Sequence, residues 1–461
     1  MNRQCLCENK SLIITALLIF LSVPLFLIYG GDLLFDELEH LRASYLVSLG
    51  FHPYKDFFEH HHPTLWYLWA PLLKYLPHNQ ILLFYLSRIL TTMFSLIGVY
   101  YIYQTARRFF GGKKTATCVL VIYFSFYFAQ TMAVVFKPDA YMWSAYLCGL
   151  YHFFCYVDTK QQKHLCIAST AFAVSFIFLQ TAAFLILPVA LFSLYLIYKE
   201  ASVLQKFIPA VIPALVLLSI FFALIHLTSG IIPYYQRNWV LNAHFGKFME
   251  YSDLFLPKFL IFILIGYGAY IYQIKTRQAT IYTHMMAFIL TTDFIKNIIY
   301  LSPFPHYFQP EALAFAFLLA PMISQFPSIV KNYLTATLII FNIFNIFTSL
   351  FVLPNKPYFE QINIIRKDKN ARVYPAEIQI YTPYFPFYWF FPTVEMLDNT
   401  LFNKNKTLNM TDYIISNHID YFMDETLNGQ KFQLINKDTF SQFYELISDK
   451  PYTVYKRKAD L

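Results

Sequence analysis

The sequence has little charge, little glycine and little cysteine. Of its 461 residues 13% are charged, 12 are Gly and 6 are Cys, while 57% are hydrophobic and 20% aromatic. The aromatic content and the few cysteines exclude a disordered chain, a collagen-like fibre and a small disulfide scaffold. A soluble protein of this length cannot bury so much apolar surface, and the mean hydropathy is +0.44. These figures predict a multi-spanning membrane protein.

Several common motifs are also missing. The sequence contains no Gly-rich phosphate loop, no dinucleotide fingerprint and no helical repeat of fixed period. Its formal net charge of +8 would suit a nucleic-acid partner, but the position of the charges along the chain decides between this and other causes. Residues 354–461 hold 13 basic and 13 acidic residues. The entire positive excess therefore lies in residues 1–353.

Apolar runs fill residues 1–353. Crossing roughly 30 Å of hydrocarbon takes about 20 residues, and the runs predict an α-helical polytopic protein with about 11 transmembrane helices. Only Gln180 and Thr181 separate the fifth and sixth of them. The predicted spans are 11–30, 81–104, 115–133, 140–157, 165–179, 182–197, 207–228, 255–273, 280–300, 309–325 and 333–352.

Basic residues identify the cytoplasmic loops, because positive segments resist translocation. With the N-terminus inside, every inside loop is basic, and only Glu8, Asp158 and Glu200 oppose the positive charges. This pattern predicts a multi-pass protein of the plasma (inner) membrane whose residues 354–461 lie outside. The net charge is then a topology signal, and we expect no nucleic-acid partner. The basic residues on this side are Arg3, Lys10, Arg107, Arg108, Lys113, Lys114, Lys160, Lys163, Lys199, Lys206, Lys275, Arg277 and Lys331.

Acidic residues gather on the outer side, most of them in an outward first loop at residues 31–80. Within residues 36–49, apolar residues recur at spacings of 3 and 4, which predicts a helix lying in the membrane interface. Asp36 and Glu37 begin this helix, where the helix dipole favours negative charge. They are either capping acids or carboxylates that transfer a proton or bind a cation. The outer acids are Asp32, Asp36, Glu37, Glu39, Asp56, Glu59, Asp139, Glu250, Asp253 and Glu311.

A second polar cluster in this loop is Glu59-His60-His61-His62. On a helix neighbouring side chains point about 100° apart, so the three His cannot share one metal ion, although one or two can. The alternative is a polar patch among aromatic residues. Glu59 with a flanking His is the stronger candidate, because a carboxylate and an imidazole can hold Mg²⁺ or Mn²⁺ or orient a phosphate.

Charged residues also interrupt later apolar runs. Lys137-Pro138-Asp139 precedes the fourth span, residues 305–311 open the tenth with several polar groups, and Arg88 lies within the second. A charge inside an apolar run is costly unless it is paired or functional. A phosphate or a neighbouring acid is the expected partner of Arg88.

Together these features resemble the bacterial C-fold (GT-C) membrane glycosyltransferases, which are similar to protein O-mannosyltransferases and the lipid A aminoarabinose transferase. Four features at the outer face carry the resemblance in order: the acidic pair after the first span, PYKDFFEHHHPTLWYL at 53–68, KPDA at 137–140 and PHYF at 305–308. The resemblance is best over residues 1–150 and moderate over residues 303–325.

The resemblance implies a glycosyltransferase that moves a hexosyl or pentosyl group from a polyprenyl-phosphate donor at the outer face of the membrane. The acceptor would be a glycolipid, a glycan or a protein, and membrane lipid would surround the enzyme. Asp36 would be the catalytic base, with Glu37 and Asp139 as further catalytic carboxylates. Glu59 would also be the ligand of a divalent cation, Mg²⁺ or Mn²⁺. The implied substrate-binding residues are Glu59, His60, His61, Arg88, Lys137, His306 and Tyr307.

From Pro354 onward the composition changes to mixed polar and apolar. Short apolar runs predict strands at residues 372–374, 378–381, 413–415 and 452–455, and a helix near residues 440–447. We therefore predict two domains, a transmembrane domain at residues 1–353 and a small extracytoplasmic α/β domain at residues 354–461.

Two other functions compete with the enzyme. A secondary transporter needs charged groups at the membrane midplane, and Asp293 and Lys296 can pair there on one helix face. The 12 Gly disfavour the broken helices typical of such transporters. The other alternative is a non-catalytic membrane scaffold that presents the C-terminal domain.

Overall fold

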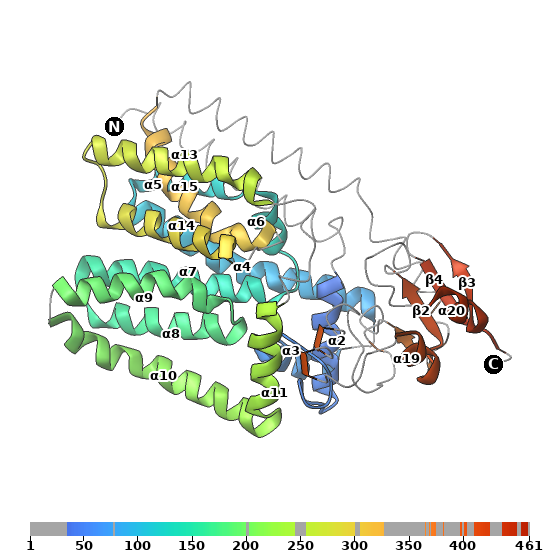
Figure 1. Ribbon diagram of the computed structural model, residues 1–461. Coiled ribbons are helices and arrows are strands. Elements are labelled where there is room, and N and C mark those ends of the chain that lie inside the picture. The colour runs from blue at the N-terminus through green and yellow to red at the C-terminus, as the bar shows by residue number, and fades with distance from the viewer. Residues whose placement is uncertain are drawn as a thin grey trace. The chain divides into compact units, whose positions relative to one another are not determined.

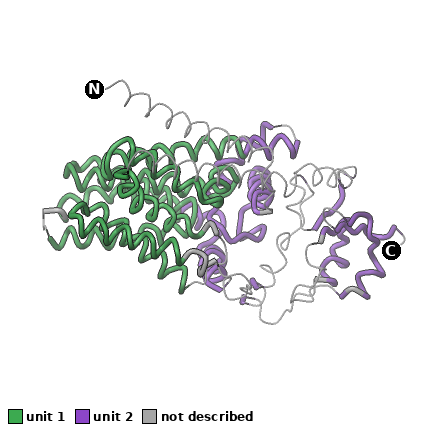
Figure 2. The backbone as a smooth tube through the Cα atoms, turned by 90° about the horizontal axis from the view of Figure 1, so that it is seen from above, with its two compact units in different colours: residues 1–29, 88–222, 246–351 green, residues 30–87, 223–245, 352–461 purple. Residues whose placement is uncertain are grey.

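The computed structural model describes residues 35–76, 79–199, 202–244, 255–299 and 305–326, and in the C-terminal region 365, 368, 370–374, 381, 397–398, 401–402, 410–424, 436–449 and 453–459. The predicted spans 11–30 and 333–352 lie outside the described residues, as do Asp32, Glu250 and Asp253. Two units emerge (Figure 2). Unit 1 comprises residues 1–29, 88–222 and 246–351, and unit 2 comprises residues 30–87, 223–245 and 352–461.

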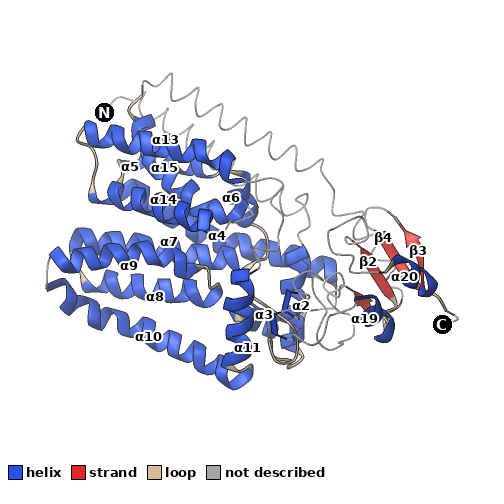
Figure 3. Ribbon diagram, viewed as in Figure 1, coloured by secondary structure: helices blue, strands red, loops and turns tan. Residues whose placement is uncertain are grey.

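Unit 1 consists of helices (Figures 1 and 3). Their apolar sequences explain the fold, because a helix satisfies all its backbone hydrogen bonds within itself and is stable where water is absent. The helices are α4 (Gln80–Phe109), α5 (Gly112–Tyr123), α6 (Tyr127–Met132), α7 (Pro138–Thr159), α8 (Gln162–Phe178), α9 (Ala182–Lys199), α10 (Ser202–Thr228), α13 (Phe255–Lys275), α14 (Ile281–Ile299), the 3-10 helix η2 (Pro305–Phe308) and α15 (Gln309–Ser324). Of these, α4 begins and α10 ends in unit 2.

Several of these helices are long and apolar enough to cross a membrane. Among the described residues three meet that standard in full: Gln80–Phe109, Ala182–Lys199 and Leu204–Thr228. Gln162–Phe178, Leu260–Lys275 and Gln309–Ser324 are shorter apolar helices. Large hydrophobic side chains such as Ile208 and Leu227 of α10 are exposed, as expected of surfaces that face lipid. The protein is a polytopic helical membrane protein, and the count of eleven spans stays a prediction.

The predicted third span is wrong as a single helix. Residues 115–133 form α5 and α6, with a break at residues 124–126. The Gln130 side-chain amide donates to the carbonyl of Phe124, and Ser125 Oγ donates to the carbonyl of Ile122 at 2.6 Å. These side chains satisfy carbonyls that a break leaves without helical partners. The tight connection between the fifth and sixth spans is confirmed, since α8 ends at Phe178 and α9 begins at Ala182.

Unit 2 contains the first loop, which is itself largely helical. A helix is present at the predicted position as α2 (Phe35–Ser48), although its polar residues Glu37, Glu39 and Arg42 are as buried as its apolar ones, and its place in the membrane interface stays a prediction. An irregular segment and α3 (Thr64–Tyr75), which we did not predict, follow it. Gly50, with φ of 93°, follows the end of α2. A later segment of the chain adds α11 (Ile231–Tyr235) and the π-helix η1 (Gln236–Leu241).

The described residues of the C-terminal region form a small sheet, whose strands are red in Figure 3, and two short helices. The strands are β1 (Val373–Tyr374), β2 (Tyr421–Asp424), β3 (Tyr444–Ser448) and β4 (Thr453–Arg457), in the order β1-β2-β4-β3. The β1-β2 pair is parallel, and the other two pairs are antiparallel. The helices are α19 (Met410–Ser416) and α20 (Lys437–Phe443).

The strand predictions for this region are confirmed at 372–374 and 452–455. The prediction at 413–415 is wrong, because these residues belong to α19. The helix expected near 440–447 ends at Phe443, and β3 follows directly. Residues 378–380 lie outside the described part of the chain.

Candidate functional site

Two carboxylates and two imidazoles meet inside unit 2. Glu39 and His40 come from α2, and Glu59 and His61 come from the irregular segment that precedes α3; their ligand atoms lie within 4.8 Å of one another. His61 Nδ1 lies 3.3 Å from Glu39 Oε1 and 3.4 Å from Glu59 Oε2. Glu39, His40 and Glu59 are buried, whereas His61 is partly exposed. We call these four residues the acid–imidazole cluster.

Trp66 fixes the tautomer of His40. The indole Nε1 of Trp66 is only a donor, and it lies 3.1 Å from His40 Nδ1. His40 Nδ1 therefore accepts, and a neutral His40 carries its proton on Nε2. A protonated nitrogen cannot bind a metal ion, so the potential ligands of the cluster are Glu39, Glu59 and His61. Two carboxylates and one imidazole fit Mn²⁺ or Zn²⁺ better than Mg²⁺, which prefers oxygen ligands alone.

Burial changes the protonation of this region. Burial, and next the neighbouring charge of Glu39, raise the pKa of Glu59 well above its ordinary value. Glu59 Oε1 is buried with no hydrogen-bond partner among the described residues. A proton shared with Glu39 or a divalent cation between the two carboxylates would each reduce their repulsion.

The three consecutive His point to three different partners. His61 belongs to the acid–imidazole cluster, His60 Nδ1 lies 2.9 Å from Asn242 Oδ1, and His62 Nε2 lies 2.7 Å from the Tyr234 hydroxyl. The expectation that they cannot share one ion agrees with this geometry, although the segment is irregular rather than helical. Burial, and next His61, lower the pKa of His60 to about 4. His60 is therefore neutral at pH 7 and contributes no positive charge to a phosphate.

The π-helix η1 and the residues beside it position this segment. Asn242 Nδ2 donates to the carbonyl of His60 at 2.8 Å, and Arg237 Nη1 donates to the carbonyl of Tyr54. Tyr54 has φ of 67°, a backbone conformation that is strained for a bulky residue and that recurs at functional sites. Its hydroxyl donates to the carbonyl of His61. Backbone contacts on both sides thus hold the His segment in one conformation.

Asp36 and Glu37 occupy the first turn of α2. Asp36 is half-buried and close enough to His60 to influence its charge, whereas Glu37 is fully buried. Asp36 and Glu39 are three residues apart and share one face of the helix. The structure thus brings four of the predicted site residues to one region of unit 2: Asp36, Glu59, His60 and His61.

The remaining predicted site residues belong to unit 1. Arg88 is buried on α4, Lys137 is buried immediately before α7, and Asp139 is half-buried in its first turn. Thr91 Oγ1 lies 3.2 Å from the Tyr141 hydroxyl, and Ser144 Oγ donates to the carbonyl of Phe94 at 3.0 Å.

These two hydrogen bonds join α4 to α7. Arg88 lies three residues before Thr91 on α4, and Lys137 and Asp139 lie at the start of α7. The gathering of these three side chains at one place stays a prediction.

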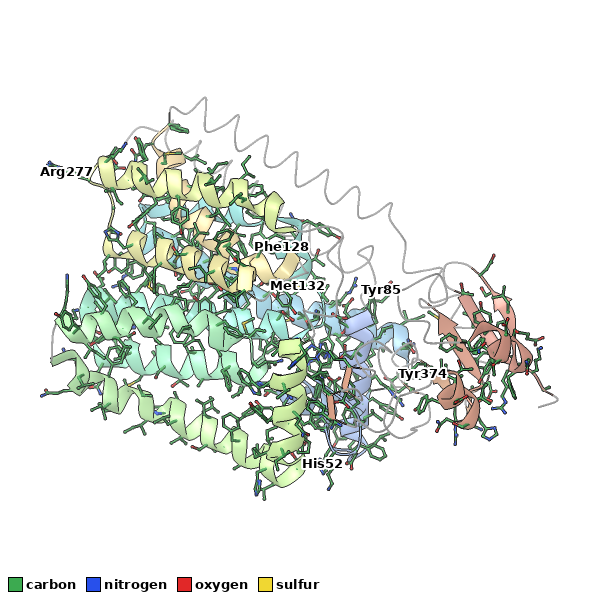
Figure 4. All side chains as sticks on the ribbon, viewed as in Figure 1. His52, Tyr85, Phe128, Met132, Arg277 and Tyr374 are labelled. Atoms are coloured by element: carbon green, nitrogen blue, oxygen red, sulfur yellow. The ribbon has the colours of Figure 1, made fainter. Side chains whose placement is uncertain are left out.

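The KPDA motif and the residue after PHYF border a small cavity of unit 1, of about 20 Å³. Ala140 of the first motif and Gln309, directly after the second, both line it, together with Trp143 and Ser144. Met132 of α6, labelled in Figure 4, contributes to the wall. Ala140 and Gln309, 169 residues apart in the chain, thus meet at a space about large enough for one water molecule.

His306 and Tyr307 form part of η2 at the start of α15. The Tyr307 side chain is half-buried, and its carbonyl accepts from Asn297 Nδ2 at 3.4 Å. The same amide donates to Glu311 Oε1. Lys296 Nζ lies 3.0 Å from Asp293 Oδ1, so the expected pair on one helix face is confirmed.

Several residues of the unit 2 site were not predicted as site residues. Glu39 and His40 could have been predicted, since they stand three and four residues after Asp36 and share its helix face. Asn242, Tyr234 and Arg237 could not have been predicted. They contact the His segment from 172 to 183 residues further along the chain, and only the folded structure brings them together.

Comparison with known proteins supports the resemblance. Residues 63–226 match the model of the family described as dolichyl-phosphate-mannose-protein mannosyltransferase. The fold is similar to the crystal structure of ArnT from Cupriavidus metallidurans bound to undecaprenyl phosphate, with a TM-score of 0.65, 10% sequence identity and 98% of each chain covered. The resemblance to C-fold membrane glycosyltransferases is confirmed. The same ArnT in the apo state gives a TM-score of 0.63 at 10% identity, again over 98% of each chain. A search of curated proteins finds no match.

Proposed function

We propose that this C-fold relative is a glycosyltransferase that uses a polyprenyl-phosphate-linked sugar. The match of residues 63–226 to a mannosyltransferase family model supports sugar transfer. A similar fold in a protein whose crystal structure contains undecaprenyl phosphate supports the donor class. The observation that carries the proposal is the set of carboxylates that α2 and the following segment gather in unit 2.

Asp36 is the general base in this proposal. The acceptor hydroxyl gives its proton to Asp36, its oxygen forms a bond to C1 of the sugar, and the bond from C1 to the phosphate oxygen breaks. Polyprenyl phosphate leaves. A base must be ionised and accessible, and Asp36 is half-buried at a helix N-terminus, where the dipole favours the carboxylate. Glu37 is fully buried, and the raised pKa of Glu59 favours its protonated form unless a cation is bound.

The other predicted residues have supporting roles. Arg88 and Lys137 supply positive charge for the donor phosphate, His306 and Tyr307 bind substrate, and Asp139 positions the acceptor. Glu59, with Glu39 and His61, holds a divalent cation, which supplies positive charge when bound. Glu37 supports the other carboxylates.

We further propose that transfer occurs at the outer face of the plasma (inner) membrane, with the N-terminus in the cytoplasm. The basic inside loops and the acid-rich first loop support this orientation. The predicted division into a transmembrane domain at residues 1–353 and an extracytoplasmic domain at residues 354–461 is part of the same proposal.

The experiment is transfer of label from a radiolabelled polyprenyl-phosphate sugar to acceptors of the cell envelope by the purified protein. Asp36→Asn should lower the rate by about 10²–10⁴-fold, the usual contribution of a general base. Asp56→Asn, which removes a carboxylate from the same loop, is the matched control and should keep the rate. Full activity of Asp36→Asn at normal expression would rule out its role as base. Absence of label transfer with every acceptor, together with counterflow of substrate into vesicles, would favour a transporter.

A further inference from the structure

A second group of metal-ligating side chains lies in unit 1, apart from the proposed transferase residues. His152 and Cys155 come from the last two turns of α7, and His164 comes from the first turn of α8. One ligand atom of each lies within 4.8 Å of the others. The helices join through Lys160, whose φ of 57° makes the tight turn. These three residues therefore lie at the turn end of the α7–α8 hairpin.

The distances approach those of a zinc site. His152 Nδ1 and His164 Nδ1 lie 3.0 Å apart, and their rings are stacked with centroids 5.2 Å apart. With Zn–N bonds of about 2.0–2.1 Å, two nitrogens of a tetrahedral site lie about 3.3 Å apart. A small separation of the two rings would therefore admit the ion. Without an ion, the two imidazoles form an N–H···N hydrogen bond. That hydrogen bond does not involve the Cys155 thiol beside it.

A guanidinium group lies beside the thiol of Cys155. Arg108 Nη1 lies 3.3 Å from Cys155 Sγ, and Arg108 Nη2 lies 2.8 Å from Asp158 Oδ2. The guanidinium stabilises negative charge on sulfur, and Asp158 offsets the guanidinium charge. Cys155 is buried, whereas both His are half-buried and leave a path for an ion.

We propose that His152, Cys155 and His164 bind one Zn²⁺ ion and clamp the end of the α7–α8 hairpin. A thiolate with two imidazoles is a soft donor set that selects Zn²⁺ over Mg²⁺ and Mn²⁺. The site differs in chemistry from the acid–imidazole cluster, which contains no sulfur. In the predicted topology it faces the cytoplasm.

Cobalt substitution tests the site independently of activity. Purified full-length protein is stripped with a chelator and titrated with Co²⁺, and the absorption band from thiolate to cobalt is followed. The wild type should show a band that saturates at one equivalent and that Zn²⁺ removes. His164→Ala and Cys155→Ser should both lose it. Cys148→Ser, on the same helix, and a Cys5→Ser/Cys7→Ser double variant should keep it.

Each alternative result overturns the proposal. Absence of the band in the wild type excludes a sulfur-containing metal site. Loss of the band in the Cys5→Ser/Cys7→Ser variant with retention in Cys155→Ser assigns the metal to the N-terminal thiols. His164→Ala guards against misfolding of the buried Cys155 variant, because His164 is half-buried on the first turn of its helix. If the band persists in His164→Ala, His164 is not a ligand of the metal ion, and the ion does not join α7 to α8.

Discussion

At the scale of single residues, burial separates groups of identical chemistry. Asp36 and Glu37 are neighbouring acids, yet Asp36 is half-buried and Glu37 is fully buried. His60 is buried and held by Asn242, while the partly exposed His61 contacts two carboxylates. A sequence contains the residue types, but the solvent exposure that assigns their roles comes from residues far away in the chain.

The acid–imidazole cluster leads to a prediction about metal binding. Mn²⁺ added to the chelator-treated protein should bind between Glu39, Glu59 and His61. Glu59→Gln keeps the shape of the side chain but replaces a charged ligand oxygen with a neutral one. Its affinity for Mn²⁺ should fall by more than the roughly 10–100-fold that loss of an outer-shell partner costs. Paramagnetic resonance of free Mn²⁺ measures the affinity, and unchanged binding by Glu59→Gln would remove Glu59 from the site.

Two comparisons control this experiment. Asp56→Asn removes a carboxylate from the same loop, and it keeps an oxygen that can accept from the His52 amide, as Asp56 Oδ2 does at 2.7 Å. It should bind Mn²⁺ as the wild type does. Cys155→Ser should also bind normally, because the proposed Zn²⁺ site does not include the acid–imidazole cluster.

At the scale of elements, apolar pattern and turn residues predict most helices. The long helices are present because their continuous apolar sequence favours helices in a membrane. The helix with Asp36 in its first turn was predicted from apolar spacing, but it also buries Glu37 and Arg42, which that spacing did not predict. The break between α5 and α6 was invisible, since Phe124 and Phe126 continue the apolar run and the Gln130 side chain supplies the missing hydrogen bond. Ile414 was mistaken for a strand residue because short apolar runs do not distinguish strand from helix.

Close packing between α7 and α8 leads to a prediction about stability. A Cβ added at Gly149 would lie 2.6 Å from a ring carbon of Phe172, which is nearly buried on α8. Overpacking of this kind costs about 1–3 kcal/mol. Gly149→Ala should therefore lower the apparent Tm of the detergent-solubilised protein, as measured by thermal unfolding.

Gly268 of α13 is the matched control. Nothing lies within 4 Å of a Cβ added there, and alanine is favoured over glycine in a helix interior by about 0.5–1 kcal/mol. Gly268→Ala should leave the apparent Tm unchanged or raise it. If both variants unfold at the same temperature, the close contact between Gly149 and Phe172 is not a feature of the folded protein.

At the scale of the whole molecule, the separation of basic loops from the acid-rich first loop, which predicts the topology, was the most informative property of the sequence. It identified the first loop as acid-rich, and two acids of that loop, Glu39 and Glu59, belong to the acid–imidazole cluster. The average composition conceals this loop, because the net charge of the whole chain is positive. The contacts of residues 234–242 with this cluster depend on chain folding over long separations and had no sequence signal.

The orientation of the chain is open to a direct test with two single-cysteine additions. Gln161 in the α7–α8 turn and Ser441 of α20 are both exposed, so burial limits the reactivity of neither. In intact cells a membrane-impermeant maleimide should label Ser441→Cys and leave Gln161→Cys unlabelled, with the wild-type chain as background. Permeabilisation should then expose Gln161→Cys, because the orientation predicted from the positive loops places this turn in the cytoplasm. Labelling of Gln161→Cys before permeabilisation, with Ser441→Cys protected, would reverse the topology and place the acid-rich loop in the cytoplasm.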